Sequence, residues 1–333
     1  MIYMYMHRNS NNIRMKRGVE GKGYEELSAK YYGVCFVGGM LSAGITHVAI
    51  TPMDVLKVNM QVHPDKYKGS NIICGLATLW KEQGPYSLWR GWSSKLFGYG
   101  LQGGFKFGLY EYFKNFYSAD DAFFANNNNN NNKNKTLIFF LSSSSSQIIA
   151  DVALSPFEAV KVRVQASHPL FAKGLADGFP LLYRTEGLSG FYRGLVPLWA
   201  RNLPYSMIMF STFEHSVDLI YRNMIQRRKQ DCSIPQQLGV TCLAGYTAGA
   251  IGTLISNPAD NVVSTLYNKK AESAMQAVKS IGFANLFTRS LPLRIALVGP
   301  VVTLQWFFYD TIKLLCGLPT SGGGLARPEG AEG

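Results

Sequence analysis

The chain has 333 residues, of which 47% are hydrophobic, and its formal net charge is +12. Such a basic balance suits nucleic-acid binding only when the charge lies on a soluble face among aromatic residues, whereas here it alternates with long apolar runs. The five cysteines are scattered without a CxxC pair or a metal-ligand spacing. Because the chain also lacks a nucleophile–base constellation and a phosphate-binding Gly loop, we expect no enzyme, cofactor, catalytic residue, metal site or nucleic-acid partner.

Residues 1–30 form an N-terminal extension ahead of the first apolar run. They carry six basic and three acidic residues and lack the apolar core of a signal peptide. The basic residues leave open whether a transit peptide is cleaved here, and the three acids argue against one.

Six apolar helices are expected in the rest of the chain. Residues 33–50, 238–257 and 295–309 contain no Asp, Glu, Lys or Arg, and with their flanks each approaches the roughly 20 residues that cross a bilayer. The pattern therefore favours an all-α membrane protein, with a soluble all-α protein as the alternative. The expected helices are 33–62, 91–117, 136–166, 194–223, 236–268 and 291–315.

One short motif occurs three times, about a hundred residues apart, so the chain consists of three tandem units with pseudo-three-fold symmetry. In each copy a proline is followed two residues later by an acid, and the proline is expected to kink its helix. The pairs are Pro52 with Asp54, Pro156 with Glu158, and Pro258 with Asp260. The expected units are repeat one (31–118), an Asn-rich linker (119–135), repeat two (136–223), a second linker (224–235), repeat three (236–316) and a disordered Gly- and Pro-rich tail (317–333).

The connections inside the repeats hold the positive charge. Residues 57–95, 161–201 and 264–294 contain 17 Lys and Arg but only 5 Asp and Glu, while the rest of the chain holds 16 of each. A short amphipathic helix is expected in each connection, followed by an aromatic–Arg pair such as Trp89-Arg90. The positive-inside bias would place all three connections on the side from which proteins insert, or beside the mitochondrial matrix.

A second acidic motif closes each even-numbered helix. The copies begin at Tyr110-Glu111, Phe213-Glu214 and Tyr309-Asp310. Together with the proline motifs and the aromatic–Arg loops, they cover residues 31–316 and resemble the mitochondrial carrier family. Stretches such as 51–69, 101–114 and 150–165 are similar to its phosphate-carrier branch.

The resemblance implies a multi-pass transporter of the mitochondrial inner membrane that works by alternating access. It would import inorganic phosphate into the matrix with a proton, or in exchange for hydroxide, with both termini in the intermembrane space. Membrane lipid, including cardiolipin, is the expected further partner, and a functional monomer is expected. A carrier of sulfate or a dicarboxylate, and a carrier-fold scaffold that no longer transports, are the alternatives.

The resemblance also implies two gates in which acids pair with bases of neighbouring helices. Each gate has three acids and two bases, because Val263 and Val217 stand where the third bases would be. The expected matrix gate consists of Asp54, Lys57, Glu158, Lys161 and Asp260. The expected intermembrane-side gate consists of Glu111, Lys114, Glu214, Asp310 and Lys313.

Substrate and proton sites are expected where the three repeats differ. Charge inside a membrane span is costly and indicates function. Lys106 and Arg201 are the leading phosphate ligands, since Arg can bind an oxyanion through two hydrogen bonds. The further substrate candidates are Gln102, Asn202, Gln305 and Arg294, although the two glutamines are equally suited to helix–helix hydrogen bonding and Arg294 to an interfacial place.

Proton coupling is expected at His47, Asp54, Asp151 and Glu158. His47 precedes Asp54 by nearly two helical turns, so both share one face, and an unperturbed imidazole titrates near 6.5. A structural role for a lone helical histidine is the alternative. Gln147 and Met209 depart from the family pattern, which has Glu and Lys at these positions and so suggests an ion pair there.

Overall fold

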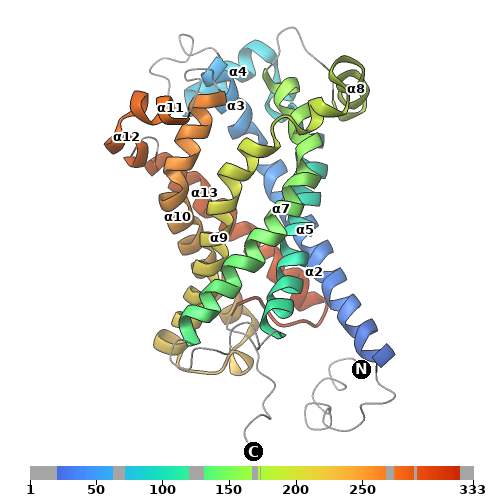
Figure 1. Ribbon diagram of the computed structural model, residues 1–333, viewed down its shortest axis with the longest axis vertical. Coiled ribbons are helices and arrows are strands. Elements are labelled where there is room, and N and C mark those ends of the chain that lie inside the picture. Colours follow the sequence, from blue (N-terminus) through green and yellow to red (C-terminus); the bar gives the residue numbers. More distant parts are fainter. Residues whose placement is uncertain are drawn as a thin grey trace, which may run out of the picture.

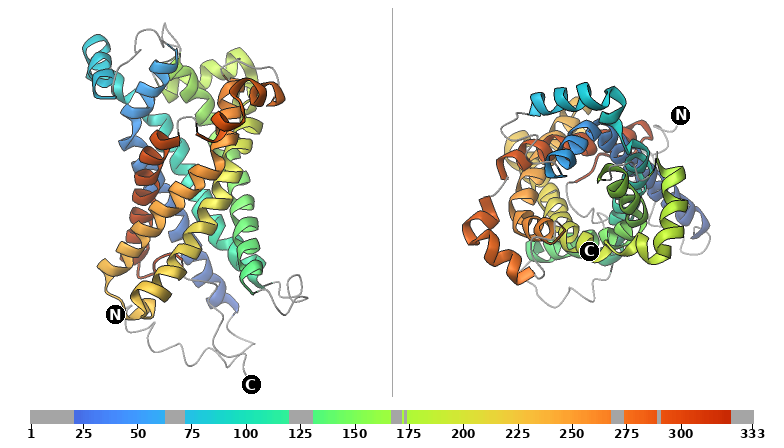
Figure 2. Two further views of the ribbon diagram at one scale, coloured as in Figure 1. Left: turned by 90° about the vertical axis from the view of Figure 1, so that its left-hand side faces the viewer. Right: turned by 90° about the horizontal axis from the view of Figure 1, so that it is seen from above.

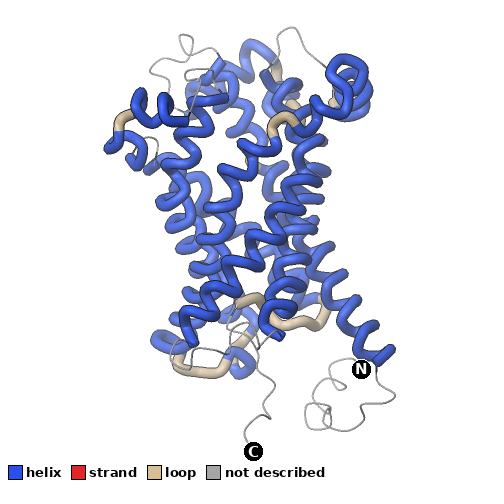
Figure 3. The backbone as a smooth tube through the Cα atoms, in the orientation of Figure 1, coloured by secondary structure: helices blue, strands red, loops and turns tan. Residues whose placement is uncertain are grey.

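The computed structural model describes residues 21–62, 72–119, 131–166, 172, 174–267, 274–288 and 291–322, and its regular elements in these ranges are helical (Figure 3). The long helices are α2 (Gly21–Ala49), α5 (Trp92–Ala119), α7 (Asn131–Ala166), α9 (Leu195–Ile220), α10 (Ile234–Tyr267) and α13 (Leu291–Leu315), and α3 (Thr51–Val62) continues α2. The shorter helices are α4 (Ile72–Gln83), α8 (Leu175–Tyr192), α11 (Ala274–Ile281) and α12 (Phe283–Thr288).

The long helices form a closed ring. Contacts run from α2 to α5, then through α7, α9, α10 and α13, and from α13 back to α2. The view along the long axis shows the ring with the short helices around one end (Figure 2). We call this the short-helix end. At the opposite end, which we call the termini end, lie the start of α2 and the end of α13 (Figure 1).

The expected helices match those of the structure within a few residues, apart from the first. That helix begins at Gly21, inside the expected N-terminal extension, and is interrupted at Ile50 between α2 and α3. The interruption lies two residues before Pro52, which has no backbone N–H to continue the hydrogen bonds of the helix. In contrast, α7 and α10 run without a break through Pro156 and Pro258.

Four helices are long and apolar enough to cross a membrane. They are Ala29–Ala49, Lys135–Val164, Ile234–Val262 and Arg294–Leu315. The run Ser142–Ser146 lies within the second of these, and its buried hydroxyls donate to carbonyls of the same helix. These serines are therefore small packing residues inside a span, and their backbone is helical.

An aromatic cluster fills the ring near the termini end. Phe213 and Trp306 stack with their ring centroids 3.6 Å apart, and Phe107, Phe210 and Tyr309 surround them. The cluster joins residues of α2, α5, α9, α10 and α13. Because stacked and edge-on aromatic side chains bury large apolar areas, the cluster closes the ring interior at this end.

Helices α2 and α5 approach each other closely at two glycines. A Cβ atom on Gly103 would lie 2.5 Å from the carbonyl oxygen of Gly39 and 2.3 Å from the Cβ of Ala43. Only glycine fits at such a distance, as in the small-residue interfaces of membrane helices.

The Gly103→Val variant is therefore expected to lower the thermal stability of the purified protein in detergent, at a cost of about 1–3 kcal/mol typical of overpacking. Gly33→Val on α2 is the matched control, because a Cβ at Gly33 meets nothing within 4 Å. Equal melting temperatures for the two variants would contradict the role of the close approach.

Candidate functional site

A buried carboxylate, that of Asp151, organises the polar side chains in the middle of the ring. Its Oδ1 accepts hydrogen bonds from Gln102 at 2.8 Å, Gln147 at 2.7 Å and Asn202 at 2.9 Å. These donors come from α5, α7 and α9, so one carboxylate connects three helices. Its Oδ2 is buried and has no hydrogen-bond partner among the described residues. One oxygen of Asp151 is thus left for a ligand or a proton.

The two expected phosphate cations lie beside this cluster. Arg201 donates from Nε to the side-chain oxygen of Asn202 at 3.1 Å, and Asn202 in turn donates to Asp151. The ammonium of Lys106 lies 5.9 Å from the ring centre of Tyr205 and 5.3 Å from that of Phe210. Within the described part of the chain, Lys106 forms no ion pair. A half-buried cation held over aromatic faces is available to an anionic ligand.

The remaining substrate candidates have different surroundings. Gln102 and Asn202 belong to the Asp151 cluster, whereas Gln305 on α13 is half-buried. Arg294 lies nearer the short-helix end, where it donates to Asn257 at 2.9 Å and pairs with Asp260. In this conformation Arg294 is therefore the ion-pair partner of Asp260, the acid of the third proline motif.

Among the described side chains at the short-helix end, no motif acid pairs with a base of a neighbouring motif. Asp54 pairs with Lys95 of α5, and Asp260 pairs with Arg294 of α13. Glu158 pairs with Lys161 of its own motif, at 2.7 Å. The side chain of Lys57 lies outside the described residues. The expected network between motifs is therefore not formed among the described side chains.

His47 lies in this same region. Its ring stacks on Tyr99 with the centroids 4.0 Å apart. The Tyr99 hydroxyl donates to Glu158 at 3.1 Å and accepts from Lys161 at 2.9 Å. One aromatic side chain thus places the imidazole next to the Glu158–Lys161 pair.

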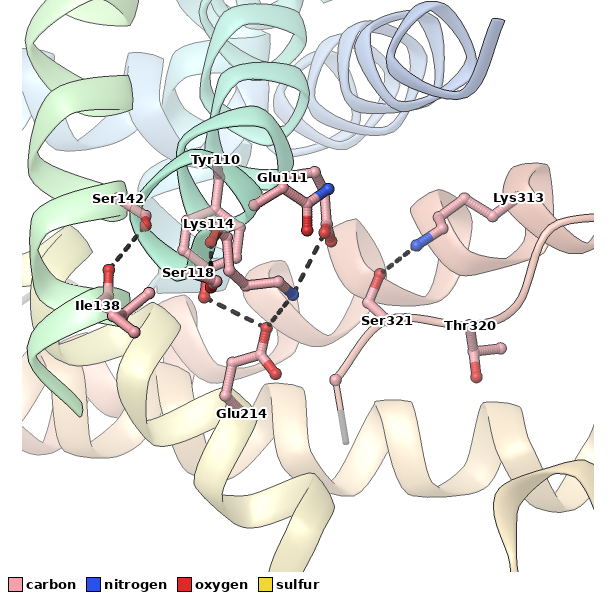
Figure 4. Close-up of polar contacts among 12 residues, drawn as sticks. Tyr110, Glu111, Lys114, Ser118, Ile138, Ser142, Glu214, Lys313, Thr320 and Ser321 are labelled. Carbon is pink, nitrogen blue, oxygen red and sulfur yellow. Dashed lines mark hydrogen bonds and ion pairs between the residues drawn. The ribbon is translucent and has the colours of Figure 1, made fainter. Parts of the chain in front are cut away.

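At the termini end, the expected gate residues are buried and joined across helices. Lys114 of α5 contacts Glu214 of α9 at 2.8 Å and Glu111 of its own helix at 3.2 Å (Figure 4). Asp310 accepts from the Thr241 hydroxyl at 2.7 Å and from the backbone N–H of Ser321 at 2.8 Å. Removing these charges from water is costly unless every partner is satisfied, so the network indicates a closed end.

Two residues of this site were missed by sequence reasoning, Lys95 and Tyr99. Lys95 is fully buried in α5, whereas from the sequence we only counted it in the positive charge of residues 57–95. A signal was present, since Lys95 and Arg294 each precede the closing acid of their helix by the same sixteen residues. Tyr99 had no comparable signal, because only its contacts with His47 and Glu158 distinguish it.

Gln147 and Met209, the two departures from the family pattern, also differ in their surroundings. Gln147 accepts from Ser206 at 2.6 Å in addition to its bond with Asp151. Met209 is buried in the aromatic cluster. Neither position carries a charge: Gln147 is hydrogen-bonded to Asp151 and Ser206, and Met209 packs among aromatic side chains.

A helical ring that is polar in its middle, with buried ion pairs and aromatic side chains across one end and separate ion pairs of the proline-motif acids at the other, is typical of a membrane carrier. The model of the family "Mitochondrial carrier protein" matches residues 28–121 and 132–224. The two matched segments begin 104 residues apart, which is also the spacing between Pro52 and Pro156. The chain belongs to the mitochondrial carrier family, whose members are transporters rather than enzymes.

Curated relatives share most of the length of the chain. It is 66% identical to "Mitochondrial phosphate carrier protein 1, mitochondrial" of Arabidopsis thaliana, over 92% of this chain and 95% of that protein. It is 41% identical to "Solute carrier family 25 member 3" of Homo sapiens, over 88% of this chain and 78% of that protein. The "Phosphate carrier protein, mitochondrial" of Caenorhabditis elegans is 42% identical over 88% of this chain and 83% of that protein.

Proposed function

We propose that this chain carries inorganic phosphate across the mitochondrial inner membrane into the matrix. The observation that carries the proposal is the 66% identity to a protein named as a mitochondrial phosphate carrier, over almost the full length of both chains. The Lys106–Asp151–Arg201 region supports it, because it offers a cation and polar donors in the middle of the helical ring. Phosphate is a tetrahedral anion that such groups bind well.

The six long helices then span the membrane as three tandem repeats, with the short-helix end in the matrix. This orientation rests on the charge distribution, since the connections at that end carry the surplus of Lys and Arg. Both termini then lie in the intermembrane space. Cardiolipin is the expected lipid partner, and we propose that the monomer transports.

Transport proceeds by alternating access in this proposal. The described conformation is closed at the termini end by Lys114 and Glu214 and open at the matrix end. Closing the matrix end requires Asp54 and Asp260 to leave Lys95 and Arg294 and to pair with bases of neighbouring motifs, Lys57 and Lys161. Such an exchange of partners is feasible because each acid that leaves one base gains another, so that no buried charge is left unpaired.

A proton accompanies the phosphate. His47 lies beside Glu158 through Tyr99, and Asp151 has one oxygen without a partner among the described residues. Together with Asp54, these groups form a series of titratable sites from the matrix end to the middle of the ring. The alternative coupling, exchange for hydroxide, gives the same overall proton balance.

The test is uptake of labelled phosphate by the purified protein in liposomes, with and without a pH gradient that is alkaline inside. We expect accumulation that the gradient stimulates and that sulfate and dicarboxylates inhibit only weakly. Stronger inhibition by either competitor would assign the chain to another anion. If none of these anions is taken up, the chain is a carrier-fold scaffold.

A further inference from the structure

The segment that follows α13 has a defined path with Thr320 and Ser321 buried, although its composition predicted a disordered tail from Gly317. Gly317 ends the helix with a φ of 75°, its N–H donates to the carbonyl of Leu314, and the N–H of Leu318 donates to that of Lys313. This is a Schellman motif, which reverses the chain direction at a helix end. We call residues 318–322 the strap. It crosses the termini end of the ring (Figure 3), and residues 323–333 lie outside the described structure.

One lysine holds the strap from the loop between α9 and α10. The Lys229 ammonium donates to three consecutive carbonyl oxygens of the strap, those of Thr320 at 2.5 Å, Ser321 at 3.0 Å and Gly322 at 2.9 Å. Burial lowers the pKa of Lys229 to about 8, so the side chain remains charged at neutral pH. Three charge-assisted hydrogen bonds to one short segment make a specific attachment.

The strap also contacts the gate itself. The N–H of Ser321 donates to Asp310 at 2.8 Å. The Ser321 hydroxyl accepts from Lys313 at 3.2 Å, as Figure 4 shows. The side chains of Thr320 and Ser321 are both nearly fully buried. A tail without a specific binding site would leave its polar groups in water, whereas Ser321 forms hydrogen bonds with Asp310 and Lys313.

The strap lies where the three-fold pattern of acids and bases lacks its third base. Lys114 pairs with Glu214 of the next even helix, and by symmetry a base at position 217 would pair with Asp310. Val217 stands there instead, and a Cβ atom added to Gly322 would lie 2.7 Å from its Cγ2. The strap therefore lies directly on the residue that replaces the missing base, and its Ser321 amide bonds the acid that this base would have served.

We propose that the strap is the third closing element of the termini-end gate, and that it must leave Val217 and Asp310 before this end opens. The inference rests on the proposed alternating-access cycle. Lys114 supplies one bond between helices, and the strap, fastened by Lys229, supplies the bond that a base at 217 would make. Opening of this end then requires the strap to move away from Val217 and Asp310, in addition to the breaking of the ion pairs between helices.

A reversible cross-link tests whether the strap has to move. Val217→Cys and Gly322→Cys are introduced together after the five native cysteines have been replaced by alanine. A Cβ at Gly322 would lie 2.9 Å from that of Val217, so a small shift of the strap gives the roughly 3.5–4.5 Å of a disulfide. We expect the oxidised protein to lose phosphate uptake and the reduced protein to regain it, with the two single-cysteine variants unaffected by oxidant. Equal uptake before and after reduction would overturn the proposal.

A second measurement is independent of transport and of disulfide formation. Ser321→Cys in the cysteine-free protein is labelled with a water-soluble maleimide, with Lys229 intact or replaced by Gln. Loss of the three charge-assisted bonds should speed labelling by about tenfold or more. Lys279→Gln on α11 is the matched control, since it removes an exposed lysine at the opposite end. Equal labelling rates for the Lys229→Gln and Lys279→Gln variants would overturn the role of the strap. Absence of phosphate uptake by the native protein would count only against the proposed function.

Discussion

Replacing Lys106 with glutamine is expected to reduce phosphate uptake by about 100-fold or more. Lys106 lies over Tyr205 and Phe210 and forms no ion pair within the described residues, so its charge is available to the transported anion. A 100-fold loss is about 2.8 kcal/mol, which lies within the range of about 2–5 kcal/mol that is typical when one partner of a hydrogen-bonded charge pair is removed. The measurement is the initial rate of labelled phosphate uptake in liposomes, normalised to the amount of folded protein.

The control for this variant is Lys279→Gln, which removes the same charge from an exposed position on α11. Lys106→Arg should keep part of the activity, because the charge is retained while its geometry changes. Uptake by Lys106→Gln within twofold of the native rate would show that Lys106 does not bind phosphate, and it would leave Arg201 as the main candidate.

The second large effect is expected for His47→Ala, which should abolish stimulation of uptake by a pH gradient. The imidazole stacks on Tyr99, whose hydroxyl bonds Glu158, so its removal breaks the proposed series of proton sites between the matrix end and Asp151. Exchange of phosphate for phosphate at equal pH should continue, because that exchange moves no net proton. The ratio of uptake with and without the gradient is the quantity to measure.

His215→Ala is the matched control, because His215 on α9 contacts the Thr136 hydroxyl at 2.8 Å, away from the Asp151 cluster. If the pH gradient still stimulates His47→Ala by the native factor, His47 is not on the proton path. Loss of exchange together with loss of stimulation would point to the structural role that stacking on Tyr99 also allows.

Local sequence patterns predicted the helices and drew attention to the acids of the two repeated motifs. Apolar runs without charge have few alternatives to spanning a membrane, because their backbone polar groups must be satisfied within the segment. The acids were found because each of the two acidic motifs occurs three times along the chain. The prediction was poorer where a single residue acts, as with Tyr99, or where a composition rich in Gly indicated disorder, as with the strap.

The partners of the charged residues could not be predicted in the same way. Asp54 was expected to contact a base of the proline motifs, whereas in this conformation it pairs with Lys95 of the following helix. An acid at a helix end has several bases within reach, and the separation and rotation of the helices decide which one it contacts. The same reason explains why Arg294, expected to bind substrate, pairs with Asp260.

The sequence by itself determined the three copies of the proline–acid motif and the apolar helices, and it led us to propose functional roles for His47, Lys106 and Arg201 and the absence of a base at position 217. These features depend on residue type and spacing along one chain. The tertiary structure alone decided which end is closed, because closure depends on contacts between distant helices such as that of Lys114 with Glu214. It alone also placed Gly322 on Val217, since the chain reversal at Gly317 brings a segment remote in sequence onto the position where the base is absent.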